Sequence, residues 1–283
     1  VSLTQRGTAS LARIDEMMLQ QPLIAAPLQP VPLPTARGEI EFRDVTVEFN
    51  GRKALDGVSL RIEAGSTVAI VGHTGSGKTT LVQLIPRLLD TTSGTVLFDG
   101  HDVRVYDPQE LRRQIGFVPQ ETFLFSNTLA GNIGFGVPDA TEEAIRRSAE
   151  MAGLASDIAG FPDGYDTVVG ERGITLSGGQ KQRAAIARAI LRDPALLILD
   201  DALSSVDTLT EERILSALED TMSRRTTILI SHRVSTVSRA QKIFVIEQGS
   251  IAEQGTHSEL IDKGGYYADL YQKQLLEEEL EAI

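Results

Sequence analysis

Cysteine is absent from the 283 residues of this sequence, which excludes disulfide bonds and cysteine-ligated metal sites. Long apolar runs are also absent: no stretch of about eighteen or more apolar residues occurs, so we expect no membrane-spanning helix within the chain. Positive charge is scarce, because 27 Lys and Arg face 39 Asp and Glu and give a formal charge of −12. A protein that coats nucleic acid needs a basic surface, so we expect no nucleic-acid partner.

Hydrophobic residues make up 41% of the sequence, enough for a sizeable core, and their pattern is typical of an α/β fold. The strand-like segments are residues 39–49, 58–65, 66–72, 195–200, 226–231 and 242–249. The later ones are uninterrupted apolar runs separated by helical segments, as a parallel sheet covered on both faces requires. We therefore predict an α/β core with an antiparallel β part near its start and a helical insertion at residues 141–158.

The two ends of the chain are predicted to lie outside the main domain, which we place at residues 39–265. Residues 1–20 show apolar residues at helical spacing, and the prolines of residues 21–38 exclude a regular helix. This linker is either a semi-rigid polyproline-type spacer or a disordered terminus. Residues 266–283 form a terminal helix with a leucine stripe, which is either solvated or paired with a helix of a partner.

Residues 72–79 match the pattern G-x-x-x-x-G-K-[ST], which lies here between an apolar strand and a helical segment. Glycines in such a loop let backbone N–H groups turn toward phosphate oxygens, and the following helix adds the positive end of its dipole. Lys78 supplies a mobile cation, and the Thr79 hydroxyl is a candidate ligand of Mg²⁺. We predict that ATP binds to Gly72, Thr74, Gly75, Ser76, Gly77, Lys78, Thr79 and Thr80.

An acidic pair, Asp200 and Asp201, follows the apolar run that begins at Ala195. In P-loop nucleotidases an acidic residue at such a strand end holds Mg²⁺ through water. Alone, a strand-end aspartate could be a helix cap. Together with the phosphate loop, Asp200 is predicted to be a metal-binding residue.

A second glycine-rich helix start, LSGGQ, occupies residues 176–180. Ser177 and Gln180 fit a capping box, so the simplest interpretation is a well-capped helix. Gly178 and Gly179 weaken the first helical turn, but they let an anion approach its N–H groups. Because the phosphate loop already has its own helix terminus, a second phosphate-binding terminus indicates a second molecule.

These motifs resemble the ATP-binding domain of ABC transporters over almost all of residues 39–265. The resemblance implies a P-loop NTPase core of the RecA-like type with an antiparallel β subdomain and an α-helical subdomain. It also implies a head-to-tail dimer in which LSGGQ contacts the γ-phosphate of ATP on the opposing domain. The implied site residues are Phe49 at adenine, Gln120 at Mg²⁺ and the attacking water, Asp207 in the dimer loop, His232 at the γ-phosphate, and Ser177, Gly178, Gly179 and Gln180 in the signature.

Two further features resemble the exporter branch of this family. Glu171, with Arg172 and Gly173 just before LSGGQ, is similar to a loop that contacts intracellular helices of the membrane part. Phe123 and Phe125 match the aromatic edge where a coupling helix of the membrane domain docks. The helix at residues 1–20 then corresponds to the end of the last membrane helix. The resemblance implies a domain on the cytoplasmic face of a membrane, attached through a transmembrane domain that precedes residue 1.

Asp201 departs from the family pattern, in which hydrolytically competent members have Glu. The missing methylene retracts the carboxylate by about 1.5 Å, and a misplacement of about 1 Å can cost about a hundredfold in rate. We therefore expect MgATP binding with impaired hydrolysis, as in the degenerate-site subunit of a heterodimeric exporter. In this interpretation Asp201, His232 and Gln120 are the catalytic residues, and the metal is held by Thr79, Gln120 and Asp200.

Three alternatives stay open. The protein could be a homodimeric exporter that uses Asp201 as a slower base. It could be a soluble ABC ATPase without a role in transport, although the exporter-like loop and the N-terminal helix count against this. It could also be a structural module that dimerises on ATP without turnover. The transported substrate cannot be read from this chain, because the contacts with it lie in the membrane helices.

Overall fold

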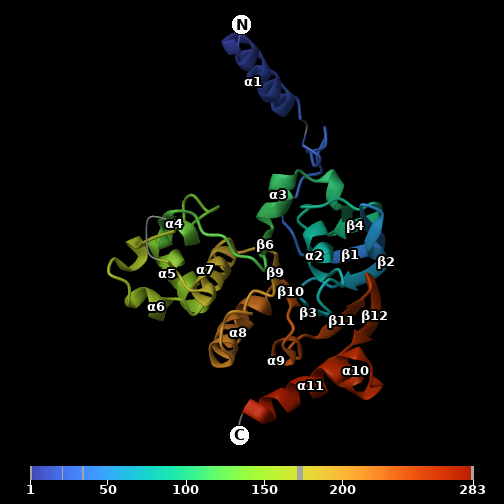
Figure 1. Ribbon diagram of the computed structural model, residues 1–283. Coiled ribbons are helices and arrows are strands. Elements are labelled where there is room, and N and C mark those ends of the chain that lie inside the picture. The colour runs from blue at the N-terminus through green and yellow to red at the C-terminus, as the bar shows by residue number, and fades with distance from the viewer. Residues whose placement is uncertain (1, 21, 34, 171–174, 282–283) are drawn as a thin grey trace.

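A six-stranded sheet in the order β12-β11-β3-β10-β9-β6 lies at the centre of the computed structural model, which describes residues 2–20, 22–33, 35–170 and 175–281 (Figure 1). The strands are β3 (Thr67–Val71), β6 (Ile115–Val118), β9 (Leu196–Asp200), β10 (Thr226–Ile230), β11 (Lys242–Glu247) and β12 (Ser250–Gly255). Neighbouring strands pair in parallel from β11 to β6, and β12 pairs antiparallel with β11.

Two hydrophobic cores lie on the two faces of this sheet. Successive side chains of a strand point to opposite faces, so Ala69 and Val71 of β3 enter one core while Val68 and Ile70 enter the other. The first core is shared with helices α7 (Gly178–Leu191) and α8 (Thr208–Met222), and the second with helix α2 (Lys78–Leu84) and the antiparallel sheet. The predicted parallel sheet, apolar on both faces, is confirmed.

The antiparallel β subdomain is also as predicted. Its sheet has the order β2-β1-β4-β5 and consists of β1 (Ile40–Phe49), β2 (Arg52–Ile62), β4 (Ser93–Phe98) and β5 (His101–Asp102). Asn50 and Gly51 join β1 to β2 with φ angles of 50° and 78°, the left-handed conformation that a two-residue hairpin turn demands. The turn η1 (Val103–Val105) and helix α3 (Pro108–Arg113) then lead into β6.

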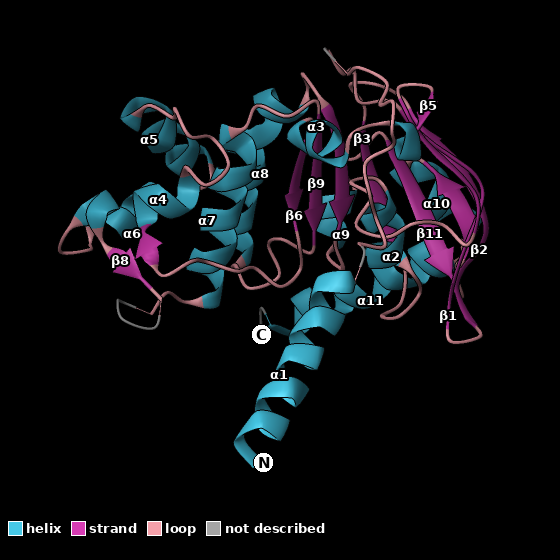
Figure 2. Ribbon diagram, turned by 90° about the horizontal axis from the view of Figure 1, so that it is seen from above, coloured by secondary structure: helices cyan, strands magenta, loops and turns pink. Residues whose placement is uncertain are grey.

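A helical lobe lies beyond the β6 edge of the central sheet, away from the antiparallel sheet (Figures 1 and 2). It contains α4 (Leu129–Ile133), α5 (Glu142–Met151), α6 (Ala155–Ala159), η2 (Gly164–Asp166), α7 and the strand pair β7 (Asn127–Thr128) and β8 (Val168–Val169). The helical insertion predicted at residues 141–158 is divided, because Gly153 adopts a φ of 66° between α5 and α6. This lobe carries the N-terminus of α7.

Helix α1 (Ser2–Leu19) extends away from the rest of the chain in Figure 1. Its apolar side chains from Leu11 onward are exposed, among them Met17 at 74% and Met18 at 80%. Within the described residues, no helix combines the length and the apolar character that crossing a membrane requires.

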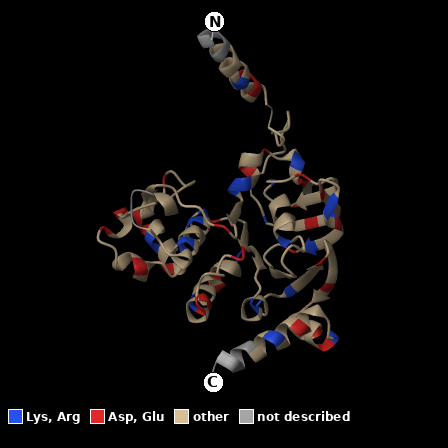
Figure 3. Cartoon of the chain, in the orientation of Figure 1, with Lys and Arg blue, Asp and Glu red and all other residues tan. Residues whose placement is uncertain are grey.

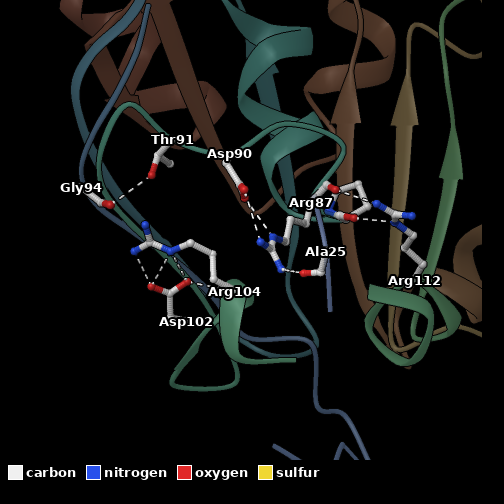
Figure 4. A network of polar contacts seen from close by, with 9 residues as sticks. Ala25, Arg87, Asp90, Thr91, Gly94, Asp102, Arg104 and Arg112 are labelled. Atoms are coloured by element: carbon white, nitrogen blue, oxygen red, sulfur yellow. Dashed lines mark hydrogen bonds and ion pairs between the residues drawn. The ribbon is translucent and has the colours of Figure 1, made fainter. Parts of the chain in front are cut away.

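The linker after α1 contacts the domain behind helix α2, as Figure 4 shows, and again at the turn η1. The guanidinium of Arg87 donates a hydrogen bond of 3.1 Å to the carbonyl of Ala25 and pairs with Asp90 at 2.9 Å. Further along, the Val31 N–H donates to the Val105 carbonyl at 2.9 Å, and Val31 packs against the second core. A part of the linker is therefore docked on the domain.

Helix α9 (Val234–Val237) precedes β11, and helices α10 (His257–Lys263) and α11 (Tyr266–Glu281) follow β12 at the C-terminal end. The predicted leucine stripe of α11 is divided: Leu270 and Tyr271 pack against the first core, whereas Leu275 and Leu276 are 41% and 60% exposed. Figure 3 shows acidic and basic residues close together along α8 and α10.

Candidate nucleotide-binding site

The phosphate loop joins β3 to α2, and its glycines are required by the backbone path. Gly72 and Gly77 have φ angles of 151° and 108°. A Cβ atom at Gly72 would lie 2.2 Å from the Ile246 carbonyl oxygen, and one at Gly77 would lie 2.6 Å from the Ala54 carbonyl oxygen. Neither position accepts a side chain, so the loop can follow this path only with glycine there.

Lys78 begins helix α2 and is 7% exposed. Its ammonium donates hydrogen bonds to the carbonyls of Gly72 and His73 at 2.8 and 2.9 Å. Burial lowers the pKa of Lys78, while the neighbouring carboxylates of Asp200 and Asp201 act in the opposite direction. The cation is thus held inside the loop, next to the place where phosphate oxygens would lie.

Asp200 ends β9, is 1% exposed and lines the same cavity as Lys78 and Thr79. Burial raises the pKa of Asp200, and a hydrogen bond from the Thr79 hydroxyl partly offsets this rise. Among the described residues, its Oδ2 atom is one of the few buried side-chain oxygens without a hydrogen-bond partner. A buried carboxylate oxygen left open beside a hydroxyl fits Mg²⁺, which keeps most of its ligands as water and phosphate.

We expect Asp200→Asn to raise the melting temperature of the chain when nucleotide and metal are absent. The raised pKa means that the folded state binds a proton more tightly than the unfolded state. The free energy of unfolding therefore falls as pH rises from the ordinary value of 3.8 through the raised pKa, and Asn removes this loss.

Thermal melts in a chelating buffer at several pH values measure this effect, with the exposed Asp139→Asn as the control. Equal melting temperatures for Asp200→Asn and the native chain at neutral pH would contradict it.

The predicted catalytic residues meet at a cavity of about 220 Å³ over the phosphate loop. Its lining residues are Ala54, Thr74, Gly75, Gly77, Lys78, Thr79, Thr80, Gln120, Asp200, Asp201, Ile230 and His232. The amide nitrogen of Gln120 lies 3.4 Å from Oδ2 of Asp201. Asp201 itself has a left-handed backbone with a φ of 50°, which Asp tolerates better than most residues. Of the predicted loop residues, Gly72 and Ser76 lie in the loop but do not line the cavity.

The signature residues 177–180 lie elsewhere, at the N-terminus of α7 in the helical lobe (Figure 2). Ser177 and Gln180 form the predicted capping box, with hydrogen bonds of 2.9 and 3.2 Å between their side chains and each other's backbone N–H groups. The Gln180 amide also donates to Asp157 of α6 at 2.9 Å, and Arg183 pairs with the same carboxylate at 2.7 Å. The described lining of the cavity includes none of the signature residues.

Other predicted contact residues lie on the surface. Phe49 ends β1 and is 47% exposed, outside the cavity lining. Asp207 caps α8 by accepting a 2.9 Å hydrogen bond from the Thr210 N–H, and this bond lowers the pKa of Asp207. Phe123 and Phe125 stack edge to face at 5.1 Å beside a second cavity, of about 360 Å³. Glu171, Arg172 and Gly173 lie outside the described residues.

Contacts around His232 were not anticipated from the sequence. Arg233 donates a hydrogen bond to the Val206 carbonyl at 2.9 Å and forms an ion pair with Glu211, which is 2% exposed. The Thr236 hydroxyl donates to the same carboxylate. These contacts tie the His232 loop to α8 and to the segment before Asp207. In the sequence, the position of Arg233 directly after His232 is only a weak sign of an ion pair at the site. Nothing in the spacing identifies Glu211 as the partner of Arg233.

The chain is similar in sequence to a known protein family and to several known proteins. A family model described as ABC transporter matches residues 55–204. The chain is 47% identical over 274 residues to a mitochondrial potassium channel ATP-binding subunit of Xenopus tropicalis, covering 95% of this chain and 40% of that protein. It is 46% identical over 261 residues to an ATP-dependent lipid A-core flippase of Ralstonia nicotianae, covering 89% of this chain and 44% of that protein.

A solved structure of a bacterial Atm1-family ABC exporter with ATP bound superimposes with a TM-score of 0.90 at 39% identity. That match covers 95% of this chain and 47% of the exporter chain. The chain thus spans less than half the length of these relatives.

Proposed function

This chain belongs to the ABC transporter family, as an ATPase domain that uses ATP with Mg²⁺, and we propose that it supplies the ATP-binding half of an exporter. The observation that carries the proposal is the gathering of Lys78, Thr79, Asp200 and Gln120 around one cavity, with the signature on a different lobe. A P-loop and a signature that do not meet within one chain need a second chain to complete the site.

In this proposal the phosphate loop and Lys78 bind the phosphates, and Phe49 stacks on the adenine ring. Thr79, Asp200 and Gln120 hold Mg²⁺, which would neutralise charge on the phosphate oxygens. Asp201 and Gln120 orient the attacking water, and His232 stabilises the γ-phosphate from the other side of the cavity. The buried, unpartnered Oδ2 of Asp200 and the amide-to-carboxylate approach of Gln120 and Asp201 support these roles.

Two copies of such a domain would sandwich two MgATP molecules head to tail, with Ser177, Gly178, Gly179 and Gln180 of one facing the phosphate loop of the other. Asp207 would lie in the contact between the domains. The capping box and the Asp157 contact support this role, because they fix the signature turn in an exposed position. Closure of this dimer would supply the motion that drives export.

We propose further that hydrolysis at this chain's own site is impaired by Asp201 and that the partner is a different half-transporter. The intact LSGGQ of this chain would then complete a competent site on the partner. A homodimeric exporter that uses Asp201 as base is the second candidate, favoured by the placement of Asp201 within reach of Gln120. The similarity to an exporter and a flippase counts against a soluble ABC ATPase without a role in transport.

The attachment to a membrane is part of the same proposal. Helix α1 would continue a transmembrane domain and place the chain on the cytoplasmic face. The exposed aromatic pair Phe123 and Phe125 lines a partly apolar cavity that would receive a coupling helix, with Glu171 as a further contact of the membrane part.

The proposed site, formed by the phosphate loop of one chain and the signature of another, can be tested by mixing two variants that each lack one of these parts. Lys78→Ala removes the phosphate-loop cation, whereas Ser177→Arg blocks the signature. Each variant alone should fail to dimerise with MgATP, because every site in its homodimer is damaged. Where the native chain self-associates with MgATP, an equimolar mixture should dimerise and retain one ATP per pair, since the phosphate loop of one variant meets the signature of the other.

Sedimentation and nucleotide retention with MgATP measure this outcome. Dimers of either single variant with bound ATP would contradict the head-to-tail arrangement. A native chain that binds MgATP but does not self-associate would favour a different partner chain over a homodimer.

A further inference from the structure

Helix α11 contacts the nucleotide site at two places. At its start, the Tyr266 ring packs edge to face on the ring of His73, with the centroids 4.6 Å apart. His73 belongs to the phosphate loop, and its carbonyl accepts the hydrogen bond from Lys78. Eight residues later, about 12 Å along the helix, Gln274 contacts the loop that carries His232. One helix therefore spans two loops that face the same cavity.

The amide of Gln274 holds the backbone that follows the His232 side chain, on both sides of Arg233. Its nitrogen donates a hydrogen bond to the His232 carbonyl. Its oxygen accepts a hydrogen bond of 2.7 Å from the N–H of Val234, the first residue of α9. In the described structure Arg233, the N-cap of α9, provides no side-chain cap. Gln274 therefore supplies from a distant helix the cap that α9 does not provide for itself.

The start of α11 is fixed well enough to act as a support. The Tyr266 N–H donates to Oε1 of Glu253 at 2.7 Å. Tyr267 is fully buried, and its hydroxyl lies 2.8 Å from the Nδ1 atom of His257 in α10. Burial raises the pKa of Tyr267 to about 12, so the hydroxyl stays protonated at neutral pH. The helix is thus anchored on α10 and β12, independently of the His232 loop.

We propose that Gln274 is a positioning residue that aims the imidazole of His232 into the nucleotide cavity. The inference rests on the function proposed for His232. The first bond fixes the peptide group that directly follows the His232 Cα atom, and the second fixes the N–H of Val234 two residues on. Together they hold the C-terminal side of His232, from which its side chain is oriented. Without them the loop keeps the contacts of the Arg233 guanidinium with Val206 and Glu211, the Thr236 hydroxyl bond to Glu211 and the local bond from the Arg233 N–H to the Ser231 hydroxyl.

Replacement of Gln274 by Ala tests the proposal by amide hydrogen exchange and by steady-state kinetics. We expect the Val234 amide to exchange at least about tenfold faster, because its acceptor is gone. The kcat for MgATP should fall about tenfold while KM changes by less than about twofold, since the phosphate loop is untouched. Gln272→Ala is the matched control, as Gln272 is an exposed residue of the same type on the same helix.

Two further variants separate a positioning role from a loss of stability. Gln274→Glu keeps an acceptor for the Val234 N–H but cannot donate to the His232 carbonyl, so we expect native exchange at Val234 with a reduced kcat. In a His232→Ala background, Gln274→Ala should change the residual kcat by less than about twofold, because the side chain that it aims is absent.

A tenfold loss that persists in the His232→Ala background would overturn the proposal, and so would unchanged Val234 exchange or a native kcat in Gln274→Ala. A native kcat in His232→Ala alone would overturn the role proposed for His232 instead. The exchange measurement would then still report whether Gln274 holds the loop.

Discussion

The Asp201→Glu variant is expected to hydrolyse MgATP about a hundred times faster than the native chain at saturating nucleotide. Oδ2 of Asp201 lies 3.4 Å from the Gln120 amide, at the long limit for a hydrogen bond. One more methylene would extend the carboxylate by about 1.5 Å into the cavity that Gln120 and His232 line. KM should change little, because Lys78 and the phosphate loop are unaltered. Initial-rate measurements over a range of MgATP concentrations give both constants.

The backbone at residue 201 adds a second expectation for the same variant. Its φ of 50° suits Asp better than Glu, so we expect the free energy of unfolding to fall by about 1 kcal/mol. Asp201→Asn is the matched control: it keeps the shape of the side chain and should bind MgATP without measurable turnover. If the native chain already hydrolyses ATP as fast as the Glu variant, Asp201 is an adequate base and the homodimeric exporter becomes the better proposal.

Arg233→Ala is expected to lower the free energy of unfolding by about 3 kcal/mol. Glu211 has a side chain only 3% exposed, and Arg233 is the cation that balances it. Removal of the guanidinium leaves a buried carboxylate with the Thr236 hydroxyl as its remaining hydrogen-bond donor and leaves the Val206 carbonyl without its donor. We place the loss at the lower end for a buried pair because Arg233 is 34% exposed. Urea denaturation of the chain measures it.

Two control variants distinguish the loss of the Arg233–Glu211 ion pair from other causes of instability. Arg213→Ala removes an exposed arginine from the same helix as Glu211 and should cost less than about 0.5 kcal/mol. The double variant Arg233→Leu with Glu211→Met removes both charges and should recover most of the lost stability. A double variant as unstable as Arg233→Ala would show that packing, rather than the unpaired carboxylate, accounts for the loss.

The central sheet, the phosphate loop and the capping box could be predicted because each depends on residues close together in sequence. Uninterrupted apolar runs identify buried parallel strands, and a glycine pattern between strand and helix identifies the loop. Ser177 and Gln180 form their box within four residues, so the sequence contains all that the turn needs. The placement of Asp200 at the end of β9 follows from the length of its apolar run.

Contacts between distant segments could not be predicted in this way. Glu211 and Arg233 pair across 22 residues, and Gln274 meets His232 across 42. Each of these residues, read alone, is typical of a solvated helix or loop. The leucine stripe of α11 shows the same limit, because periodicity indicated an apolar face without indicating that Leu270 is covered and Leu276 exposed. The roles of the site residues stay predictions until the variants are measured.

The hydrogen bond between Arg87 and Ala25 also relates the linker to the nucleotide site. The guanidinium of Arg87, three residues beyond the end of α2, holds the Ala25 carbonyl. Helix α2 is about 10 Å long, and Lys78 of the phosphate loop is its first residue, at the end away from Arg87. The linker and the phosphate loop are therefore connected through opposite ends of one short helix.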